Sequence, residues 1–446
     1  MSRAFDQAFS SLRIPAYRTL WWGGLFAFIS VQMQFLLRGI LAWDLTEREG
    51  ALGLVYLCFG LALLIATPLG GVATDRFSKR TILIGAQAVM MTAAIGMGIA
   101  VLTGVVQFWM LLVSGLFQGT AFGFFGPARV ALSADYVGRE HLGNAIALSL
   151  LSMNGTRIFA PALAGVFAGV AFIGIGGAYL IGAVMALIGF VFILALPATE
   201  SEDAPVEPVA MNGSSNGSTV AAPARPSPLA DIMDGVRYVR AKPELQRLVL
   251  TSFVVIMFGF NYVAFYPAMV EGVFGLDEAW VGYISSASAI GAVVVAVPLA
   301  GKADSPIARP AMVIGGVGFG VGVIAFGLSP SFWVAFVAIM FTGAATTVYQ
   351  SLSNTLALAA ADDSHQGRVQ SLMQLSFAGF GLAAAPLGIL AEMVGLRAAV
   401  VLMGTVVLIA VGIYAVLEGG STVLRPQPVD QPDDRPDAEL APSERS

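Results

Sequence analysis

Two glycines and four charged residues gather in the segment 70–80, between two long apolar runs that carry no charge. Glycines let two helix ends approach closely, and a carboxylate such as that of Asp75 is stabilised near a neighbouring helix N-terminus. The basic residues would hold the segment at one face of a membrane. A plain connecting loop needs only these basic residues, so the Gly-x-x-x-Asp-Arg pattern favours a moving helix pair over a mere connector. We therefore predict a conformational latch made of Gly71, Asp75, Arg76, Lys79 and Arg80.

Arg157 lies deep inside another apolar run, about 13 residues or roughly 20 Å from its start. An unpaired guanidinium at that depth costs several kcal/mol, and the apolar runs hold no acidic residue at the midplane. Two interpretations stay open. Arg157 faces a water-filled cavity and meets an anionic or carbonyl-rich solute, or backbone carbonyls and polar side chains near Pro161 satisfy it. For Arg38 and Arg129, which lie within a turn or two of the membrane surfaces, we expect snorkelling instead.

Amide and phenol side chains inside the apolar runs could form hydrogen bonds to a solute. Any single one is more often a contact between helices, so the prediction concerns the set. Six phenylalanines would suit a bulky apolar solute, although packing against lipid is the role that we expect for Phe35, Phe122, Phe125, Phe258, Phe260 and Phe265. The predicted substrate cavity consists of Gln34, Gln118, Asn154, Arg157, Asn261, Tyr262, Tyr349 and Asn354, with Gln32 and Gln350 as further polar candidates.

The composition identifies an integral membrane protein. Of the 446 residues 57% are hydrophobic and 11% charged, and the mean hydropathy is +0.81. The net charge of −5 comes largely from soluble segments, so nucleic acid is not expected as a partner. The single cysteine, Cys58, allows no intrachain disulfide. Both histidines, His141 and His365, lie between apolar runs, and no phosphate-binding loop motif occurs. We therefore expect no enzyme activity, no cofactor and no metal.

Twelve apolar runs are long enough to cross a membrane. Together they predict an all-α membrane protein, although several runs nearly merge, so that eleven or thirteen remain alternatives. The predicted spans are Leu20–Leu41, Gly50–Val72, Ile82–Leu102, Val106–Val130, Asn144–Val170, Ile173–Leu196, Leu248–Val270, Trp280–Ala300, Ala311–Leu328, Phe332–Leu358, Val369–Val394 and Ala398–Leu417.

The basic residues predict the orientation of these spans. Eighteen arginines and lysines lie on the side that holds both termini, whereas only Arg48 and Arg397 lie on the other. By the positive-inside rule both termini are cytoplasmic. We therefore expect a multi-pass protein of the inner (cytoplasmic) cell membrane that acts as a monomer.

Composition also divides the chain into segments. Residues 1–19 form a cytoplasmic leader, 20–197 a first bundle of six helices, and 247–418 a second bundle. Residues 198–246 between them are a cytoplasmic linker, first rich in Pro, Ser and Gly and then helical, with apolar residues of an amphipathic helix from Leu229 to Val239. The acidic, proline-rich tail 419–446 is expected to be disordered.

The two bundles carry related sequences. Pro68 to Asp75 is echoed by Pro298 to Asp304, one residue shorter, which adds Asp304 to the predicted latch. His141, Gly143, Leu148 and Gly155 recur 224 residues later. A parallel repeat of six helices places a cavity at the pseudo-twofold axis, where rocking of the halves can expose it to each side in turn.

With these motifs the chain resembles the major facilitator superfamily from Phe9 to Leu417. The residues that carry the resemblance are Gly71-x-x-x-Asp75-Arg76-x-x-Lys79-Arg80. It is also similar to the branch of enterobactin and macrolide exporters, through Tyr17-Arg18-x-Leu20-Trp21, Arg139-Glu140-x-Leu142-x-Asn144-Ala145 and Arg157-x-x-x-Pro161-Ala162. The resemblance implies that the first, fourth, seventh and tenth helices line the cavity. One departure is Gly115, which stands where antiporters of the family often carry an arginine linked to proton coupling.

The function that we predict is secondary active export of an amphipathic small molecule, drug-like or siderophore-like, by alternating access and coupled to protons. The latch would join the cytoplasmic ends of the two bundles in the outward-open state. Two alternatives stay open: an importer or facilitator of a small solute, and a membrane sensor or scaffold that transports nothing.

Overall fold

The computed structural model describes residues 10–170, 172–197, 228–299, 307–362 and 365–418. Apart from a short 3₁₀ turn, η1 (Ser10–Arg13), and the connections, nearly all of these residues are helical. Backbone groups buried in lipid must be satisfied within their own segment, and helices achieve this.

The first half of the chain consists of long helices, each of which runs antiparallel to the helix before it. They are α2 (Pro15–Thr46), α3 (Glu49–Arg76), α4 (Lys79–Leu102), α5 (Phe108–Ala168) and α6 (Gly174–Leu194). The helix α5 has two arms, because Gly138 within it takes a positive φ of 69°. A left-handed residue interrupts a helix, and glycine takes this conformation at little cost. The two arms are therefore the fourth and fifth spans of this half.

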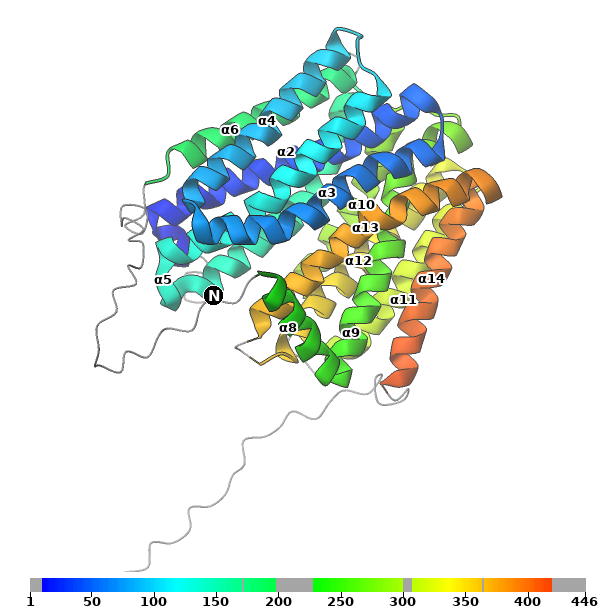
Figure 1. Ribbon diagram of the computed structural model, residues 1–446. Coiled ribbons are helices and arrows are strands. Elements are labelled where there is room, and N and C mark those ends of the chain that lie inside the picture. The colour runs from blue at the N-terminus through cyan, green and yellow to red at the C-terminus, as the bar shows by residue number, and fades with distance from the viewer. Residues whose placement is uncertain (1–9, 171, 198–227, 300–306, 363–364, 419–446) are drawn as a thin grey trace, which may run out of the picture.

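The second half repeats this arrangement. Its helices are α9 (Pro243–Val254), α10 (Ala279–Leu299), α11 (Ala308–Gly327), α12 (Phe332–Ala359), α13 (Gln366–Val394) and α14 (Leu396–Leu417). The span that begins with α9 continues as a π-helix, η2 (Val255–Gly259), and a 3₁₀ segment, η3 (Phe260–Phe265). A second π turn, η4 (Ala268–Val273), follows at its C-terminal end. Figure 1 shows the helices α2–α6 as one group and α9–α14 as the other.

Twelve helical spans in two bundles of six confirm the predicted fold class. Ten helices of the described chain are long and apolar enough to cross a membrane by themselves. The other two spans are the second arm of α5 and α13. In α13, Ala378–Val394 is a shorter apolar stretch of described residues. The helices extend beyond several predicted ends, as α2 does by starting at Pro15 instead of Leu20. Proline is well tolerated in the first turn of a helix, so the polar residues before Leu20 still form part of α2.

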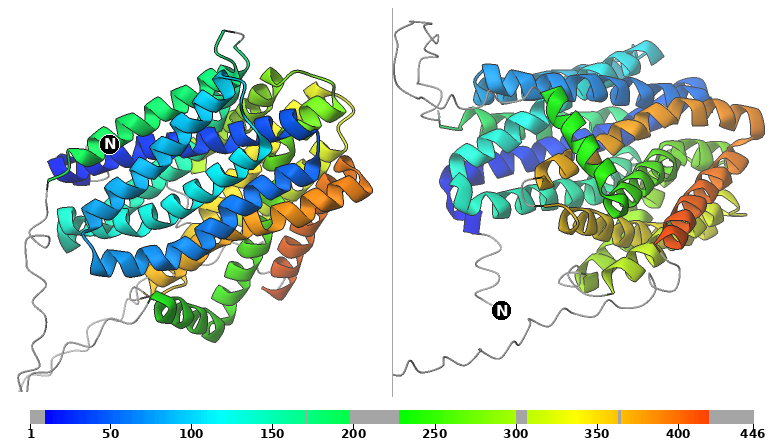
Figure 2. Two further views of the ribbon diagram at one scale, coloured as in Figure 1. Left: turned by 45° about the horizontal axis from the view of Figure 1, so that its top comes forward. Right: turned by 60° about the horizontal axis from the view of Figure 1, so that its bottom comes forward.

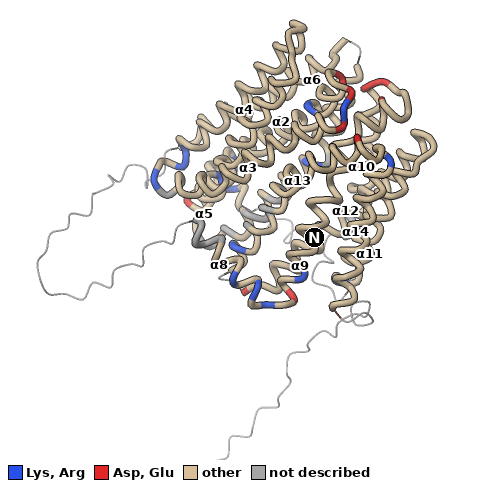
Figure 3. Tube along the Cα trace, turned by 45° about the vertical axis from the view of Figure 1, so that its right-hand side comes forward, with Lys and Arg blue, Asp and Glu red and all other residues tan. Residues whose placement is uncertain are grey.

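The two ends of the molecule differ in charge (Figure 3). We call the end where α3 meets α4 the basic end, since Lys79, Arg80, Arg247 and Arg309 lie there. We call the other one the acidic end, because the connection after α2 and the connection between η4 and α10 carry most of the acidic residues there, among them Asp44, Glu47, Asp277 and Glu278.

The amphipathic segment of the linker forms α8 (Pro228–Ala241). It lies at the basic end beside α9, as Figure 2 shows, and contacts α3 and α13 as well. Val239 is buried against the bundle, whereas Met233 is exposed. Asp234 forms an ion pair with Arg368 of α13 at 2.6 Å. The helix thus joins the second bundle and also contacts the first.

Two contacts between glycines of different helices bring the halves together near the acidic end. Between α3 and α13, a Cβ built on Gly60 would lie 2.6 Å from the Cα of Gly381. Between α5 and α10, a Cβ on Gly165 would overlap the backbone of Gly282. We call these two contacts the glycine seams. Small residues let backbones approach at such distances, so the halves are packed tightly here.

Candidate functional site: a central cavity

A cavity of about 1570 Å³, counting its open mouth, lies between the two halves. On α5 and α10 the lining residues lie on the basic side of the seam: Met153 to Pro161 before Gly165, and Ser285 to Ala292 after Gly282. On α3 the lining residues Phe59 and Leu63 lie on either side of Gly60. The seams therefore separate the cavity from the acidic end.

The wall from the first half is aromatic and carries one cation. Phe28, Phe35, Phe59 and Phe122 line it. Arg157 lines it too, and no other residue among the described lining residues is charged. Of the two interpretations that the sequence left open for Arg157, the position in the cavity wall agrees with the first.

The wall from the second half is rich in hydroxyl groups. The side chains of Tyr266, Ser285 and Thr346 line the cavity and are more than nine-tenths buried. The hydroxyl oxygen of Ser285 has no hydrogen-bond partner within the described part of the chain, and those of Tyr266 and Thr346 lie near the hydroxyl of Tyr262. Such groups are costly unless a ligand or water completes them, so this wall is suited to a polar part of a solute.

The predicted cavity residues divide into two groups. Arg157, Tyr262 and Asn354 line the cavity, as do the further candidates Gln32 and Gln350. Tyr349 lines a small neighbouring pocket that shares Asn354 and Gln350 with it. The side chain of Asn154 lies outside the described part of the structure. The remaining three, Gln34, Gln118 and Asn261, are buried in contacts between helices.

Gln34 and Gln118 accept hydrogen bonds from a buried arginine. The Nε of Arg38 donates to the backbone oxygen of Gln34 at 3.2 Å, and its Nη2 donates to Oε1 of Gln118. A Cβ built on Gly115 would lie 3.3 Å from Nη1 of Arg38. The guanidinium from α2 therefore lies beside the position on α5 where antiporters of the resembled family often carry their arginine.

Asn261 supports the irregular part of the seventh span. Its Nδ2 donates to the backbone oxygens of Met257 at 2.6 Å and of Phe380 at 3.2 Å. A π-helix and a 3₁₀ segment leave carbonyl groups without their α-helical partners. Asn261 donates a hydrogen bond to such a carbonyl and links the span to α13. The neighbouring Tyr262, in the same irregular segment, lines the cavity.

The prediction of snorkelling was wrong for Arg38 and Arg129. Their side chains are only 2% and 6% exposed. The guanidinium of Arg129 lies over the ring of Phe28, 4.8 Å from its centre, and that of Arg38 lies over Phe59 at 5.5 Å. Both side chains turn inward toward an aromatic face, and Arg38 also finds the carbonyl of Gln34 and the amide of Gln118 there.

The expectation that phenylalanines mainly face lipid was also wrong for five of the six. Phe35, Phe122 and Phe260 line the cavity. Phe125 and Phe265 are fully buried in the core instead. The sequence reasoning also missed hydroxyl residues. A signal for Tyr266 was present, because it lies four residues after Tyr262 and therefore on the same face of a helix.

The described latch residues interact within the first half. Nζ of Lys79 lies 2.6 Å from Oδ2 of Asp135, and Nη2 of Arg80 donates to the carbonyl of Leu194 at 2.9 Å. Arg76 is exposed at the end of α3. Gly71 lies in the last part of α3, the side chain of Asp75 is outside the described part, and Asp304 is outside it entirely. The latch between the two halves stays a prediction.

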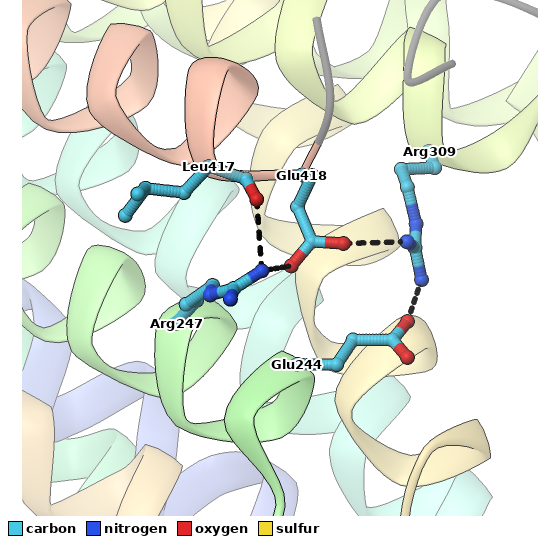
Figure 4. A network of polar contacts seen from close by, with 5 residues as sticks. All are labelled: Glu244, Arg247, Arg309, Leu417 and Glu418. Carbon is cyan, nitrogen blue, oxygen red and sulfur yellow. Dashed lines mark hydrogen bonds and ion pairs between the residues drawn. The ribbon is translucent and has the colours of Figure 1, made fainter.

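A related network closes the basic end of the second half (Figure 4). Arg309 at the start of α11 pairs with Glu418, at 3.0 Å, and with Glu244. Arg247 pairs with Glu418 at 3.2 Å and donates to the carbonyl of Leu417 at 2.8 Å. Arg309 on α11 thus holds the end of α14 as Arg80 on α4 holds the end of α6. The repeat seen in the sequence extends to these contacts.

At the acidic end, we expect Glu271 to make stability depend on pH. Burial, and next the negative charges of Asp44 and Glu278, raise the pKa of Glu271 from 4.5 to about 8. Between these two pH values the folded protein binds more protons than the unfolded chain, so stability falls as pH rises. Glu271→Gln should flatten this fall. Thermal unfolding measured from acid to mildly alkaline pH checks it, and equal slopes for both proteins would contradict it.

Comparisons with known proteins agree with this architecture. The sequence matches the Major Facilitator Superfamily over residues 20–305 and over 248–444. It is 23% identical over 360 residues to the enterobactin exporter EntS of Shigella flexneri and 22% identical over 358 residues to that of Escherichia coli O1:K1 / APEC. Each alignment covers 80% of both chains.

Solved structures share the fold. A bacterial homologue of the human lysosomal transporter Spinster, inward-facing and occupied, aligns with a TM-score of 0.67 at 15% identity, over 91% of this chain and 97% of its own. The nucleoside transporter NupG aligns with a TM-score of 0.64 at 13% identity, over 91% and 99%. With the sequence match over most of its length, this chain belongs to the Major Facilitator Superfamily of multi-pass membrane transporters.

Proposed function

We propose that the protein is a secondary active exporter of an amphipathic small molecule, works by alternating access and is coupled to the proton gradient. The observation that carries this proposal is the cavity between the halves, with an aromatic wall on one side and a hydroxyl wall on the other. A solute with an apolar body and a polar group fits both walls. The similarity to enterobactin exporters supports the direction of transport.

In the proposed orientation the basic end and both termini face the cytoplasm, because nearly all basic loop residues lie there. The glycine seams then close the outer side, and the cavity is loaded from the cytoplasm. Arg48 at the start of α3 and Glu392 on α13 add an ion pair at 3.2 Å across this closed side. The pair is exposed, so its own contribution is small, about 1 kcal/mol or less.

Reconstitution tests the proposal. The purified protein is inserted into vesicles, and a panel of amphipathic solutes is followed with and without an imposed proton gradient. We expect uptake into vesicles in which the basic end faces the bath, driven by an acidic interior. A flux that does not change with the proton gradient would indicate a facilitator, and a flux in the opposite direction would indicate an importer.

The latch gives a further prediction. Asp75→Asn should lower transport about fivefold or more, because a coupling between conformations is commonly worth 1–3 kcal/mol. Folding should stay nearly intact, as judged by elution and thermal stability. Asp277→Asn, an exposed aspartate at the acidic end, is the matched control and should transport normally. Normal flux of Asp75→Asn with an unchanged conformational balance would refute the role of the latch.

A further inference from the structure

The charges around the cavity are all of one sign. Arg157 lines it, and no acidic residue occurs among the described lining residues. Arg38 and Arg129 are absent from the lining, yet each lies against a phenylalanine that belongs to it. The wall from the first half thus presents the guanidinium of Arg157 and two aromatic rings that are backed by guanidinium groups.

An arginine behind an aromatic ring changes what the ring binds. The face of a phenyl ring is ordinarily negative and attracts cations. When a guanidinium already lies over one face, it draws electron density toward itself, and the remaining face becomes less negative. Phe28 and Phe59 therefore favour an electron-rich ring, such as that of an aromatic carboxylate or phenolate, over a cationic one.

The opposite wall completes this arrangement. The buried hydroxyl groups of Tyr266, Ser285 and Thr346 line the same cavity, and those of Tyr266 and Thr346 lie near the hydroxyl of Tyr262. They can donate hydrogen bonds to oxygen atoms of a solute, and they carry no charge that would repel an anion. Both walls thus accept a solute that is rich in oxygen acceptors.

We infer that the solute is an amphipathic organic anion with an aromatic ring, whose negative group meets Arg157 and whose ring lies against Phe28 and Phe59. This inference rests on the proposed function and names its substrate class. Arg157 provides charge recognition, and Arg38 and Arg129 act through the rings as positioning residues.

Binding of four matched probes to the full chain in lipid nanodiscs tests the inference. The probes are 2-naphthoate as anion, 2-naphthamide as neutral isostere, 2-naphthamidine as cation, and decalin-2-carboxylate as the saturated anion. We expect 2-naphthoate to bind about tenfold or more tightly than the amide, since a charge-assisted hydrogen bond supplies that difference. The amidine should bind most weakly, and the saturated acid more weakly than the naphthoate.

Variants separate the recognition of the negative charge from the recognition of the aromatic ring. Arg157→Gln should lower the affinity for 2-naphthoate to that for the amide and leave the amide unchanged, whereas Arg157→Lys should keep part of the preference. Phe59→Leu should reduce the preference for the aromatic over the saturated acid and keep the preference for anions. The control Arg397→Gln, whose guanidinium bonds the carbonyl of Ser329 at 2.7 Å near the acidic end, should behave as the unchanged protein.

The inference is overturned if the amide or the amidine binds as tightly as 2-naphthoate, if Arg157→Gln keeps the order of affinities, or if 2-naphthoate does not bind. Failure of the proposed function looks different. Anion-selective binding without transport of any solute in vesicles would contradict the proposed function alone. Export of cationic dyes without binding of 2-naphthoate would contradict the inference alone.

Discussion

Gly165→Val abolishes transport and holds the acidic end open, if the seam between α5 and α10 is the outer closure. A Cβ at this position overlaps the backbone of Gly282, which cannot move aside as a side chain can. Overpacking of this kind costs about 1–3 kcal/mol, enough to shift a balance between two conformations about fivefold or more. The clash exists only while the halves are closed here, so each half should still fold.

Accessibility to a thiol reagent reads out this shift. Cys58 is the only cysteine, so Cys58→Ser gives a background without thiols, and Ser285→Cys places a reporter in the cavity wall. An impermeant maleimide added at the acidic end should label the reporter faster in Gly165→Val. Gly412→Val is the matched control, because a Cβ there meets nothing within 4 Å. Unchanged labelling and normal flux in Gly165→Val would show that this seam does not close the passage.

We expect the second large effect, on stability, from Gln118→Leu. The change removes the side-chain acceptor of the buried Arg38 guanidinium, which keeps one bond, to the backbone oxygen of Gln34. Hydrogen bonds to charged groups contribute about 1.5–3 kcal/mol, so the free energy of unfolding should fall by about that amount. Equilibrium unfolding in mixed micelles measures it.

Removing the charge as well should restore most of the loss. In Arg38→Met with Gln118→Leu, two apolar side chains replace a buried polar pair, a change that is often neutral or stabilising. Gln107→Leu, at an exposed glutamine before α5, is the control for glutamine loss as such and should have little effect. If the double variant were as unstable as Gln118→Leu alone, the partnership of Arg38 and Gln118 would not be the reason for the loss.

The number of spans and the repeat could be predicted from the sequence, because a run of about 20 apolar residues forms few structures other than a membrane-spanning helix. It could not give the direction of the side chains around each helix. In a helix of a soluble protein, the apolar face identifies the side that packs against the core. In a membrane protein, the surrounding lipid and the protein core are equally apolar, so apolar residues do not identify that side. Phe117, which is 56% exposed, and Phe125, which is fully buried, lie two turns apart on the same helix with nothing in the sequence to distinguish them.

The same limit explains the errors at the cavity. Depth along a helix can be counted, and Arg157, which that count places far inside its span, lies in the cavity wall. Whether Arg38 reaches the membrane surface or turns inward depends on Gln118, which lies 80 residues away in the chain. The break at Gly138 lies between two predicted spans and so agrees with the sequence. The irregular segment Val255–Phe265 does not show in the sequence, because its residues are about as apolar as those of regular helices.

The central claim is that the two halves rock about the cavity, and paired spin-label distances test it most directly. In the Cys58→Ser background, labels at Leu45 and Met393 span the acidic end, and labels at Phe77 and Arg237 span the basic end; all four positions are exposed. With protein in lipid nanodiscs, a change of pH or added solute should lengthen one distance while it shortens the other. If both distances stayed fixed, or lengthened together, the halves would not alternate and the account would be contradicted.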